Sequence, residues 1–500
     1  MTGAHDPRAP RHGADQRAVV VGGGLAGTTA ALRLAEAGVA TTLVEATPRL
    51  GGLAFSFRRA GAAGELTVDN GHHVHLRCCT AYRWFLERVG ASALAPLQPR
   101  LDIPVHDAGR GRLGRLRRAA LPAPLHLGAS LARYPHLSPA ERLRVGRAAL
   151  ALRRLGTVDP SDPALDAQDF ASWLRRHGQS PRAVRALWDL VGVATLNARA
   201  PDVSLGLAAM VLTTGLLSDA GAADIGWSRV PLGHLHDTLA GAALEKAGVR
   251  VLRQSRVREL TREPDGTWRV AVDTGARRPA GSDSTDPADP TDPRGRTTLE
   301  AGTVVLAVHQ REAHRLLPEG ALDEPERLLR IGDAPILNVH VVYDRKVLHR
   351  PFLAALGTPV QWVFDRTAAS GLRDAPEGGG SQYLAVSQSA AQDEIDLPVA
   401  VLRDRYLPEL ARLMPAARGA KVRDFFVTRE RTATFAPAPG VGRLRPVART
   451  GAPGLWLAGA WTATGWPATM EGAVRSGLTA AREALAALGR PHDDVFQEAA

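Results

Sequence analysis

The sequence has few of the features that mark secreted or membrane-spanning proteins. Only two of its 500 residues are cysteines, and they are adjacent, at positions 78 and 79. Because neighbouring cysteines rarely form a bridge, we expect no disulfide framework and a reducing compartment. No run approaches the roughly 18 uncharged apolar residues that a membrane span needs. Residues 1–17 lack the apolar core of a signal peptide, so we expect a disordered leader and a cytoplasmic protein.

Lysine and aromatic residues are scarce as well, yet the chain is strongly basic. Its formal net charge is +11 at pH 7, and arginine carries most of the positive charge. A basic chain can bind nucleic acid, anionic lipid or an acidic ligand, or it can simply be rich in arginine. Aromatic residues, 5% of the chain, are not interleaved with basic ones, so no nucleic-acid partner is expected. Peripheral contact with the inner face of an anionic membrane is an open alternative.

One stretch near the N-terminus has the pattern of a dinucleotide-binding βαβ unit. The apolar run over residues 18–21 predicts a buried strand, and the Ala- and Leu-rich run over 25–37 predicts a helix that ends at Gly38. A second strand is predicted over 41–44. Three glycines in GxGxxG spacing join the first strand to the helix: Gly22, Gly24 and Gly27.

Each part of this pattern has a structural role in dinucleotide binding. Gly22 allows a tight turn, Gly24 lets the backbone approach a pyrophosphate, and Gly27 lets the helix pack closely on the strand. The phosphates are expected at the helix N-terminus, where free N–H groups favour anions. Glu45 ends the second strand, and its carboxylate can accept hydrogen bonds from the ribose hydroxyls of adenosine. By itself the pattern fits NAD as well as FAD.

The rest of the chain predicts two domains in an α/β fold. We expect a Rossmann-like dinucleotide-binding domain built from residues 18–95, 225–330 and 440–490. An α+β substrate domain, with a mixed sheet and a helical insertion, is expected over 96–224 and 331–439. The Leu- and Ala-rich helices of the insertion could wall an apolar cavity.

Two further segments are not expected to join either core. The Asp-Pro pairs within residues 277–296 favour a disordered loop between two strands. Residues 491–500 are interpreted as a tail.

Histidines follow a predicted hairpin over residues 54–68. His73 and His75 share one face of an extended segment. No further cysteine, histidine or acid stands nearby at ligand spacing, so no metal site is predicted. Histidines that line a cofactor pocket are the preferred interpretation.

These patterns resemble the amine oxidase and phytoene desaturase superfamily of FAD enzymes. That superfamily combines GxGxxG and a distant Glu with an Arg-x-Gly-Gly turn, here residues 49–52, and a C-terminal strand, glycine and helix, here residues 455–488. Within it, the chain is most similar to the hydroxysqualene dehydroxylases, also called squalene-associated FAD-dependent desaturases. The stretches that carry this likeness are residues 69–74, 361–366 and 465–477.

The resemblance implies that the cofactor is FAD. The GxGxxG turn would hold the pyrophosphate, Glu45 the adenosine ribose, and the backbone of Val257 the adenine. Gly459 would lie by the ribityl chain, and the helix that begins at Met470 would face the flavin. The implied cofactor residues are Gly22, Gly24, Leu25, Ala26, Gly27, Glu45, Ala46, Arg49, Gly51, Gly52, Val257, Gly459, Ala460 and Met470.

Two positions depart from the superfamily pattern. Ala460 stands where many members have an Asp that binds the ribityl hydroxyls, and Leu53 stands where an Arg often follows the double glycine. Both departures bear on how strongly FAD is held. Glutamine is usual at the position of His72, which we therefore interpret as incidental.

The resemblance also implies a reaction, in which reduced FAD removes the hydroxyl group of hydroxysqualene to give squalene in hopanoid and isoprenoid biosynthesis. A separate electron donor would reduce FAD again. We expect His73 to be the acid that helps the hydroxyl leave, with Asp69 holding it or acting through water. His73 could instead only line the pocket. Such a substrate needs a mostly apolar cavity.

Two other functions are open. One is an FAD-dependent carotenoid-type desaturase, similar to phytoene desaturase, in which electrons flow the other way. The other is a non-catalytic flavoprotein scaffold for isoprenoid enzymes, which the Ala460 departure would favour.

Overall fold

The computed structural model describes residues 13, 16–274, 295–373 and 380–490. The predictions of a leader, of a disordered loop and of a tail therefore fall almost wholly outside the described residues. At their edges, Arg17 and Arg296 are the first residues of strands β1 (Arg17–Val21) and β12 (Arg296–Ala301).

A parallel sheet of five strands forms the core of the predicted dinucleotide-binding part. Its order is β19–β13–β1–β2–β9, so the predicted βαβ unit lies at the centre. All of β1 after Arg17 is buried, as expected for a parallel strand that is covered on both faces. The other strands are β2 (Ala40–Val44), β9 (Arg250–Leu252), β13 (Thr303–Leu306) and β19 (Leu455–Leu457).

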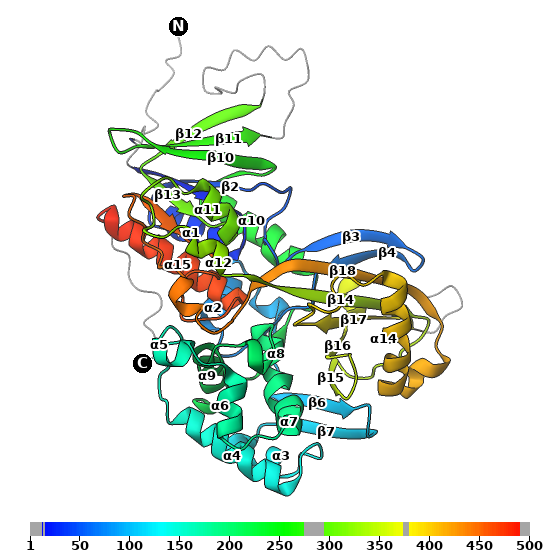
Figure 1. Ribbon diagram of the computed structural model, residues 1–500. Coiled ribbons are helices and arrows are strands. Elements are labelled where there is room, and N and C mark those ends of the chain that lie inside the picture. Colours follow the sequence, from blue (N-terminus) through cyan, green and yellow to red (C-terminus); the bar gives the residue numbers. More distant parts are fainter. Residues whose placement is uncertain (1–12, 14–15, 275–294, 374–379, 491–500) are drawn as a thin grey trace.

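Helices cover one face of this sheet and a second sheet covers the other (Figure 1). Gly477 lets α15 lie against α1, because a Cβ at Gly477 would stand 2.2 Å from the carbonyl oxygen of Ala26. The covering helices are α1 (Leu25–Glu36), α2 (Thr80–Arg88), α10 (Ala240–Lys246) and α15 (Met470–Ala487). The covering sheet consists of β10 (Ser255–Arg262), β11 (Trp268–Thr274) and β12.

A mixed sheet of seven strands forms the other half of the molecule. Its order is β18–β14–β17–β16–β15–β6–β7, and only the pair β15 and β6 is parallel. The strands are β6 (Asp102–Asp107), β7 (Arg112–Arg117), β14 (Asp333–Tyr343), β15 (Phe352–Leu356), β16 (Trp362–Asp365), β17 (Gln382–Gln388) and β18 (Val422–Phe435).

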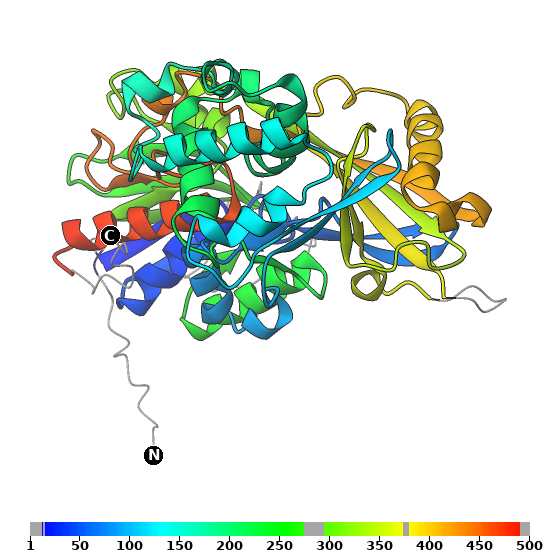
Figure 2. The ribbon, with the colours of Figure 1, turned by 90° about the horizontal axis from the view of Figure 1, so that it is seen from below.

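The two faces of this sheet have different covers. Helix α14 (Val399–Leu413) packs on one face through Leu402, Tyr406 and Leu410. A group of helices shares a buried cluster with the other face, and Figure 2 shows these helices beside the sheet. They are α3 (Gly128–Ala132), α4 (Pro139–Arg153), α5 (Pro163–Asp166), α6 (Phe170–Arg176), α7 (Pro181–Ala183), α8 (Asp189–Leu196) and α9 (Leu205–Leu212).

Strands β14 and β18 form a long ribbon between the two halves (Figure 1). At one end Asp333 accepts hydrogen bonds from Gln310 and Arg311, next to the parallel sheet. The other end lies within the seven-stranded sheet. The remaining strands and α-helices of the described chain are β3 (Ser56–Gly61), β4 (Gly64–Asp69), β5 (Val74–Leu76), β8 (Ile225–Trp227), α11 (Gln310–Leu316), α12 (Arg327–Arg330) and α13 (Thr367–Ser370).

The sequence does not predict the hairpin of β6 and β7. Strand β7 is an edge strand whose buried positions are Gly114 and Leu116, so it has almost no apolar alternation. Gly114 is required because a Cβ there would stand 2.5 Å from Nε2 of His136. In the described part of the chain, no helix is long and apolar enough to cross a membrane.

Candidate active site

The GxGxxG turn links the end of β1 to the start of α1, as predicted. Gly22 has φ +104°, and a Cβ there would stand 2.3 Å from the carbonyl oxygen of Ala307. A Cβ at Gly27 would stand 1.9 Å from the carbonyl oxygen of Gly22. Both positions therefore require glycine, for the turn and for close packing respectively.

A second glycine turn lies directly on the first. The N–H of Gly51 donates to the carbonyl oxygen of Gly23 at 2.9 Å, and a Cβ at Gly52 would stand 3.0 Å from Cα of Gly24. Gly24 caps α1 without a side-chain hydrogen bond, so the N–H groups of the first turn have no competing side-chain acceptor. Two bare backbones thus form a cradle at a helix N-terminus, a geometry that fits a pyrophosphate.

Charged residues flank this glycine cradle. Glu45 is buried, and its carboxylate accepts the N–H groups of Gly23 at 2.6 Å and Thr47 at 2.7 Å. Arg49 donates to the carbonyl oxygen of Gly52 at 2.9 Å and stacks on Phe55, with 3.3 Å between the guanidinium carbon and the ring centroid. Burial lowers the pKa of Arg49, against the opposing charge of Glu45. The guanidinium of Arg49 thus lies at the second glycine turn.

The start of β10 lies beside Glu45. The N–H of Ser255 donates to the carbonyl oxygen of Glu45 at 2.9 Å, and Val257 follows two residues later. Val257 is buried, and its carbonyl oxygen accepts a long hydrogen bond of 3.4 Å from Arg315. Ala46 is exposed at the end of β2. Glu45 and Val257, the residues expected at the ribose and at the adenine, therefore lie near each other in the fold.

The loop after β19 is organised by a buried arginine that the sequence analysis does not identify. Arg445 donates to the carbonyl oxygens of Ala460 at 3.2 Å and Trp466 at 2.8 Å, among other acceptors of this loop. Its pKa is lowered to about 10 by burial, so it stays charged at neutral pH. Position 460 thus contributes its backbone carbonyl, which does not depend on the side chain that departs from the superfamily pattern.

The loop begins with a glycine at positive φ and ends at a capped helix. Gly459 has φ +138°, and its N–H donates to the hydroxyl of Ser476 at 2.8 Å. Met470 is the first residue of α15, and the hydroxyl of Thr469 accepts the N–H of Gly472 at 3.1 Å. This arrangement presents a helix N-terminus at the end of the loop.

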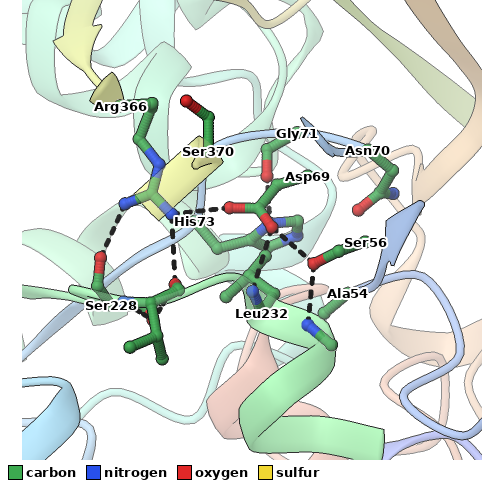
Figure 3. Close-up of polar contacts among 12 residues, drawn as sticks. Ala54, Ser56, Asp69, Asn70, Gly71, His73, Ser228, Leu232, Arg366 and Ser370 are labelled. Atoms are coloured by element: carbon green, nitrogen blue, oxygen red, sulfur yellow. Dashed lines mark hydrogen bonds and ion pairs between the residues drawn. The ribbon is translucent and has the colours of Figure 1, made fainter. Parts of the chain in front are cut away.

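Asp69 belongs to a buried ion pair (Figure 3). Its Oδ2 accepts a hydrogen bond from Nη2 of Arg366 at 2.7 Å, and the two residues are only 9% and 6% exposed. Its Oδ1 accepts from the hydroxyl of Ser56 at 2.6 Å and from the N–H of Leu232 at 2.9 Å. Arg366 also donates to the carbonyl oxygen of Ser228 at 2.6 Å.

No direct hydrogen bond joins Asp69 to His73 among the described residues. Among the described residues, Nδ1 of His73 pairs with the carbonyl oxygen of Gly71 at 2.9 Å, and Asp69 is occupied by Arg366, Ser56 and Leu232. Because a carbonyl only accepts, Nδ1 carries the proton and Nε2 of the neutral ring is an acceptor. Burial is the main cause that lowers the pKa of His73, so the neutral ring dominates at neutral pH.

His72, interpreted from the sequence as incidental, lies at the same place. It lines a small polar cavity with Asp69 and Arg366, and its ring lies 3.9 Å from that of Phe364. In the described part of the chain its Nε2 is buried without a hydrogen-bond partner. The cavity offers about 10 Å³ to water centres, close to the least that holds one water. Burial lowers the pKa of His72 well below its usual value.

Comparisons with known proteins agree with this geometry. Hydroxysqualene dehydroxylases of Rhodopseudomonas palustris and Sinorhizobium fredii are 30% and 28% identical to the chain, over 94% and 93% of it and 98% and 97% of their own lengths. The 15-cis-phytoene desaturase of Solanum lycopersicum is 23% identical over 92% of the chain and 76% of its own length.

A solved structure shares the fold. An oxidoreductase from Methanosarcina mazei superposes with a TM-score of 0.68 at 15% identity, covering 92% of this chain and 99% of its own. The family model described as flavin containing amine oxidoreductase matches residues 25–485. The chain therefore belongs to the flavin-containing amine oxidoreductase family, with FAD as its cofactor.

Proposed function

We propose that this FAD-dependent oxidoreductase removes the hydroxyl group of hydroxysqualene reductively, giving squalene for hopanoid biosynthesis. The observation that carries the proposal is the near-full-length similarity to two hydroxysqualene dehydroxylases, at 28% and 30% identity. The reaction balances as an alcohol that takes up a hydride and a proton and releases water. Bound, reduced FAD supplies the hydride.

The residues that would hold FAD follow from the geometry around the glycine cradle. The cradle and the start of α1 would take the pyrophosphate, Glu45 the ribose, and the loop held by Arg445 the flavin end. In chain order the proposed cofactor residues are Gly22, Gly24, Leu25, Ala26, Gly27, Glu45, Ala46, Arg49, Gly51, Gly52, Val257, Gly459, Ala460 and Met470.

The chain must also place a proton at the departing oxygen. His73 is the proposed donor through Nε2, and because its neutral ring only accepts there, it must first gain a proton. Asp69 is a positioning residue, since its carboxylate holds the side chains of Arg366 and Ser56 and the backbone N–H of Leu232. The buried ion pair thereby holds the wall next to the histidines.

The direct test is product analysis. We incubate the purified, FAD-loaded protein with hydroxysqualene and dithionite, and we expect squalene in the extract. Boiled protein and a reaction without reductant are the controls. The similarity to a phytoene desaturase supports a second candidate function, the desaturation of a carotenoid precursor. If the protein oxidises phytoene-type polyenes and leaves hydroxysqualene unchanged, this second function replaces our first choice. Bound FAD without turnover of any substrate would favour the scaffold.

We also propose that a basic, apolar face rests on anionic membrane, where the substrate dissolves. Residues 110–155 hold eleven arginines and one acid, Glu141. Among the described residues they also hold six of the twelve exposed large hydrophobic ones: Leu113, Leu121, Leu125, Leu143, Leu150 and Leu155. Such a mixture of arginine and leucine suits the headgroup region of an anionic bilayer.

These residues share one side of the molecule. The hairpin β6–β7 and helices α3 and α4 lie at the bottom of Figure 1 and face the viewer in Figure 2. On α4, Leu143, Arg147 and Leu150 are exposed at helical spacing, opposite the buried Val145 and Ala148. We expect co-sedimentation with vesicles that contain phosphatidylglycerol and weaker binding to phosphatidylcholine vesicles. A Leu143→Ser/Leu150→Ser variant that binds as well as the parent would contradict this surface.

A further inference from the structure

A cavity lies between helix α8 and the turn that joins β15 to β16. It measures about 280 Å³. Leu190 and Val193 line it from α8, and Leu356, Val360 and Trp362 line it from the sheet. Pockets for drug-sized ligands measure about 300–1,000 Å³, so this cavity alone accommodates only part of a 30-carbon chain.

A row of aromatic rings leads inward from this cavity. Trp362 and Phe364 are two residues apart on β16, so they point to the same face of the sheet. Their rings are nearly parallel, with centroids 6.2 Å apart, and the next ring along the row is that of His72, 3.9 Å from Phe364. Phe352 flanks both, at 6.0 Å from Trp362 and 5.8 Å from Phe364.

The inner end of the row is the polar cluster of the active site. His72 precedes His73 in the chain, and Arg366 directly follows the end of β16. The small polar cavity beside Asp69 is lined by His72 and Arg366. The row therefore lies between the α8 cavity, whose lining also includes charged side chains such as Arg185, Asp189 and Arg405, and the cluster of histidines and charges that we assign to the reaction.

We propose that Trp362 and Phe364 form a track along which the prenyl chain of the substrate lies, with the α8 cavity as its entrance. Aromatic faces pack well against an unsaturated chain, and they also stabilise positive charge on a carbon from which a hydroxyl leaves. Trp362 stands at the cavity and therefore selects for chains that are long enough to reach it.

The opposite face of the same strand offers a matched control. Val363 is fully buried in the cluster that α14 covers, whereas Trp362 is only partly buried. Truncation of Val363 removes packing of the sheet without touching the track. The identity of the chain as hydroxysqualene rests on the proposed function, but the track requires only a long prenyl chain.

The test measures binding to the FAD-loaded protein, with squalene as a 30-carbon probe and geraniol as a 10-carbon probe, by the shift of melting temperature over a ligand titration. We expect Trp362→Ala to weaken squalene binding at least tenfold and geraniol binding less than twofold, and Trp362→Phe to restore most of the squalene affinity. Val363→Ala should lower the melting temperature and keep both affinities.

Two results would overturn the track: equal effects of Trp362→Ala on both probes, or none on squalene. If Trp362→Ala does not retain FAD, Trp362→Leu is measured, with the same expectations and the same contrary results. Failure of the proposed reaction can be told apart from failure of the track. Squalene binding that depends on Trp362 in a protein without hydroxysqualene turnover upholds the track and rejects the reaction, whereas turnover with unchanged KM in Trp362→Ala does the reverse.

Discussion

Asp69 and Arg366 connect three segments that are far apart in the chain. The pair ties the end of β4 to the end of β16, and Arg366 extends the tie to the backbone at Ser228 and Val230. Each charge is buried, so each depends on the other for its solvation. The ion pair therefore orders the wall beside the histidines.

Arg366→Met should lower the free energy of unfolding by about 3–5 kcal/mol, because it leaves the Asp69 carboxylate buried without its cation. The double variant Asp69→Asn/Arg366→Met should recover a large part of this loss, since the amide oxygen can still accept from Ser56 and carries no charge. Urea denaturation of the FAD-loaded proteins measures both values. A double variant as unstable as the single one would show that charge is not the cause.

The lowered pKa of His73 predicts how turnover depends on pH. If its imidazolium donates the proton, turnover rises as pH falls from 7.5 through 6.5, by about tenfold per pH unit above the lowered pKa. His73→Gln should retain FAD and lose this acidic limb. The readout is kcat between pH 5.5 and 8. The same profile in the variant and the parent would leave His73 as a residue that only lines the pocket.

The sequence predicts the residues of the cofactor turn better than those of the reaction centre. Gly22 and Gly27 follow from spacing alone, because local backbone geometry requires them. Arg366 and His72 come together only through the pairing of distant strands, so spacing reveals neither. Both residues stand in stretches that carry the family likeness, 69–74 and 361–366, and this likeness is the available signal.

Helix packing shows the same contrast at the level of elements. The strand and helix of the βαβ unit and the capping box of α4, in which Ser138 and Glu141 bond reciprocally, follow from local sequence. The close approach of α15 to α1 depends on Gly477, which no local pattern identifies.

Two glycine substitutions within helices should have opposite effects. Gly477→Ala places a Cβ 2.2 Å from the carbonyl oxygen of Ala26, so α15 must shift, at a cost of about 1–3 kcal/mol and with weaker FAD retention. Gly146→Ala on α4 meets nothing within 4 Å and should stabilise by about 0.4–1 kcal/mol. Thermal unfolding measures the stability of both variants, and the flavin content of the purified proteins measures FAD retention. A Gly477→Ala protein as stable as the parent would contradict the packing argument.

Buried histidines make the stability of the whole molecule sensitive to acid. Burial lowers the pKa of His75 and His236 to about 4 and that of His340 to about 3, from an ordinary 6.5. Below pH 6.5 the unfolded chain gains protons that the folded protein does not accept until about pH 4. The free energy of unfolding therefore falls as pH falls through this window.

We expect each such histidine to contribute up to about 1.4 kcal/mol per pH unit between pH 6.5 and 5. Melting temperatures of the FAD-loaded protein at pH 7.5, 6.5, 5.5 and 5 test this. His340→Gln should reduce the pH dependence of stability by the contribution of one histidine. The hydroxyl groups of Tyr383 and Thr428, which bond to His340, can still bond to the glutamine amide. If the pH dependence of the melting temperature is unchanged in this variant, His340 does not contribute to the acid sensitivity.

The ribbon of β14 and β18 has a mechanical consequence. Strand β14 runs from the side of the parallel sheet into the seven-stranded sheet over about 35 Å at roughly 3.3 Å per residue, and β18 pairs with it with register shifts at Ala334/Ile336 and Val342/Tyr343. Because this paired ribbon joins the two halves, any movement of one half relative to the other must bend the ribbon. On the proposed function, a long prenyl chain would then have to enter by threading through the side wall, with one end leading.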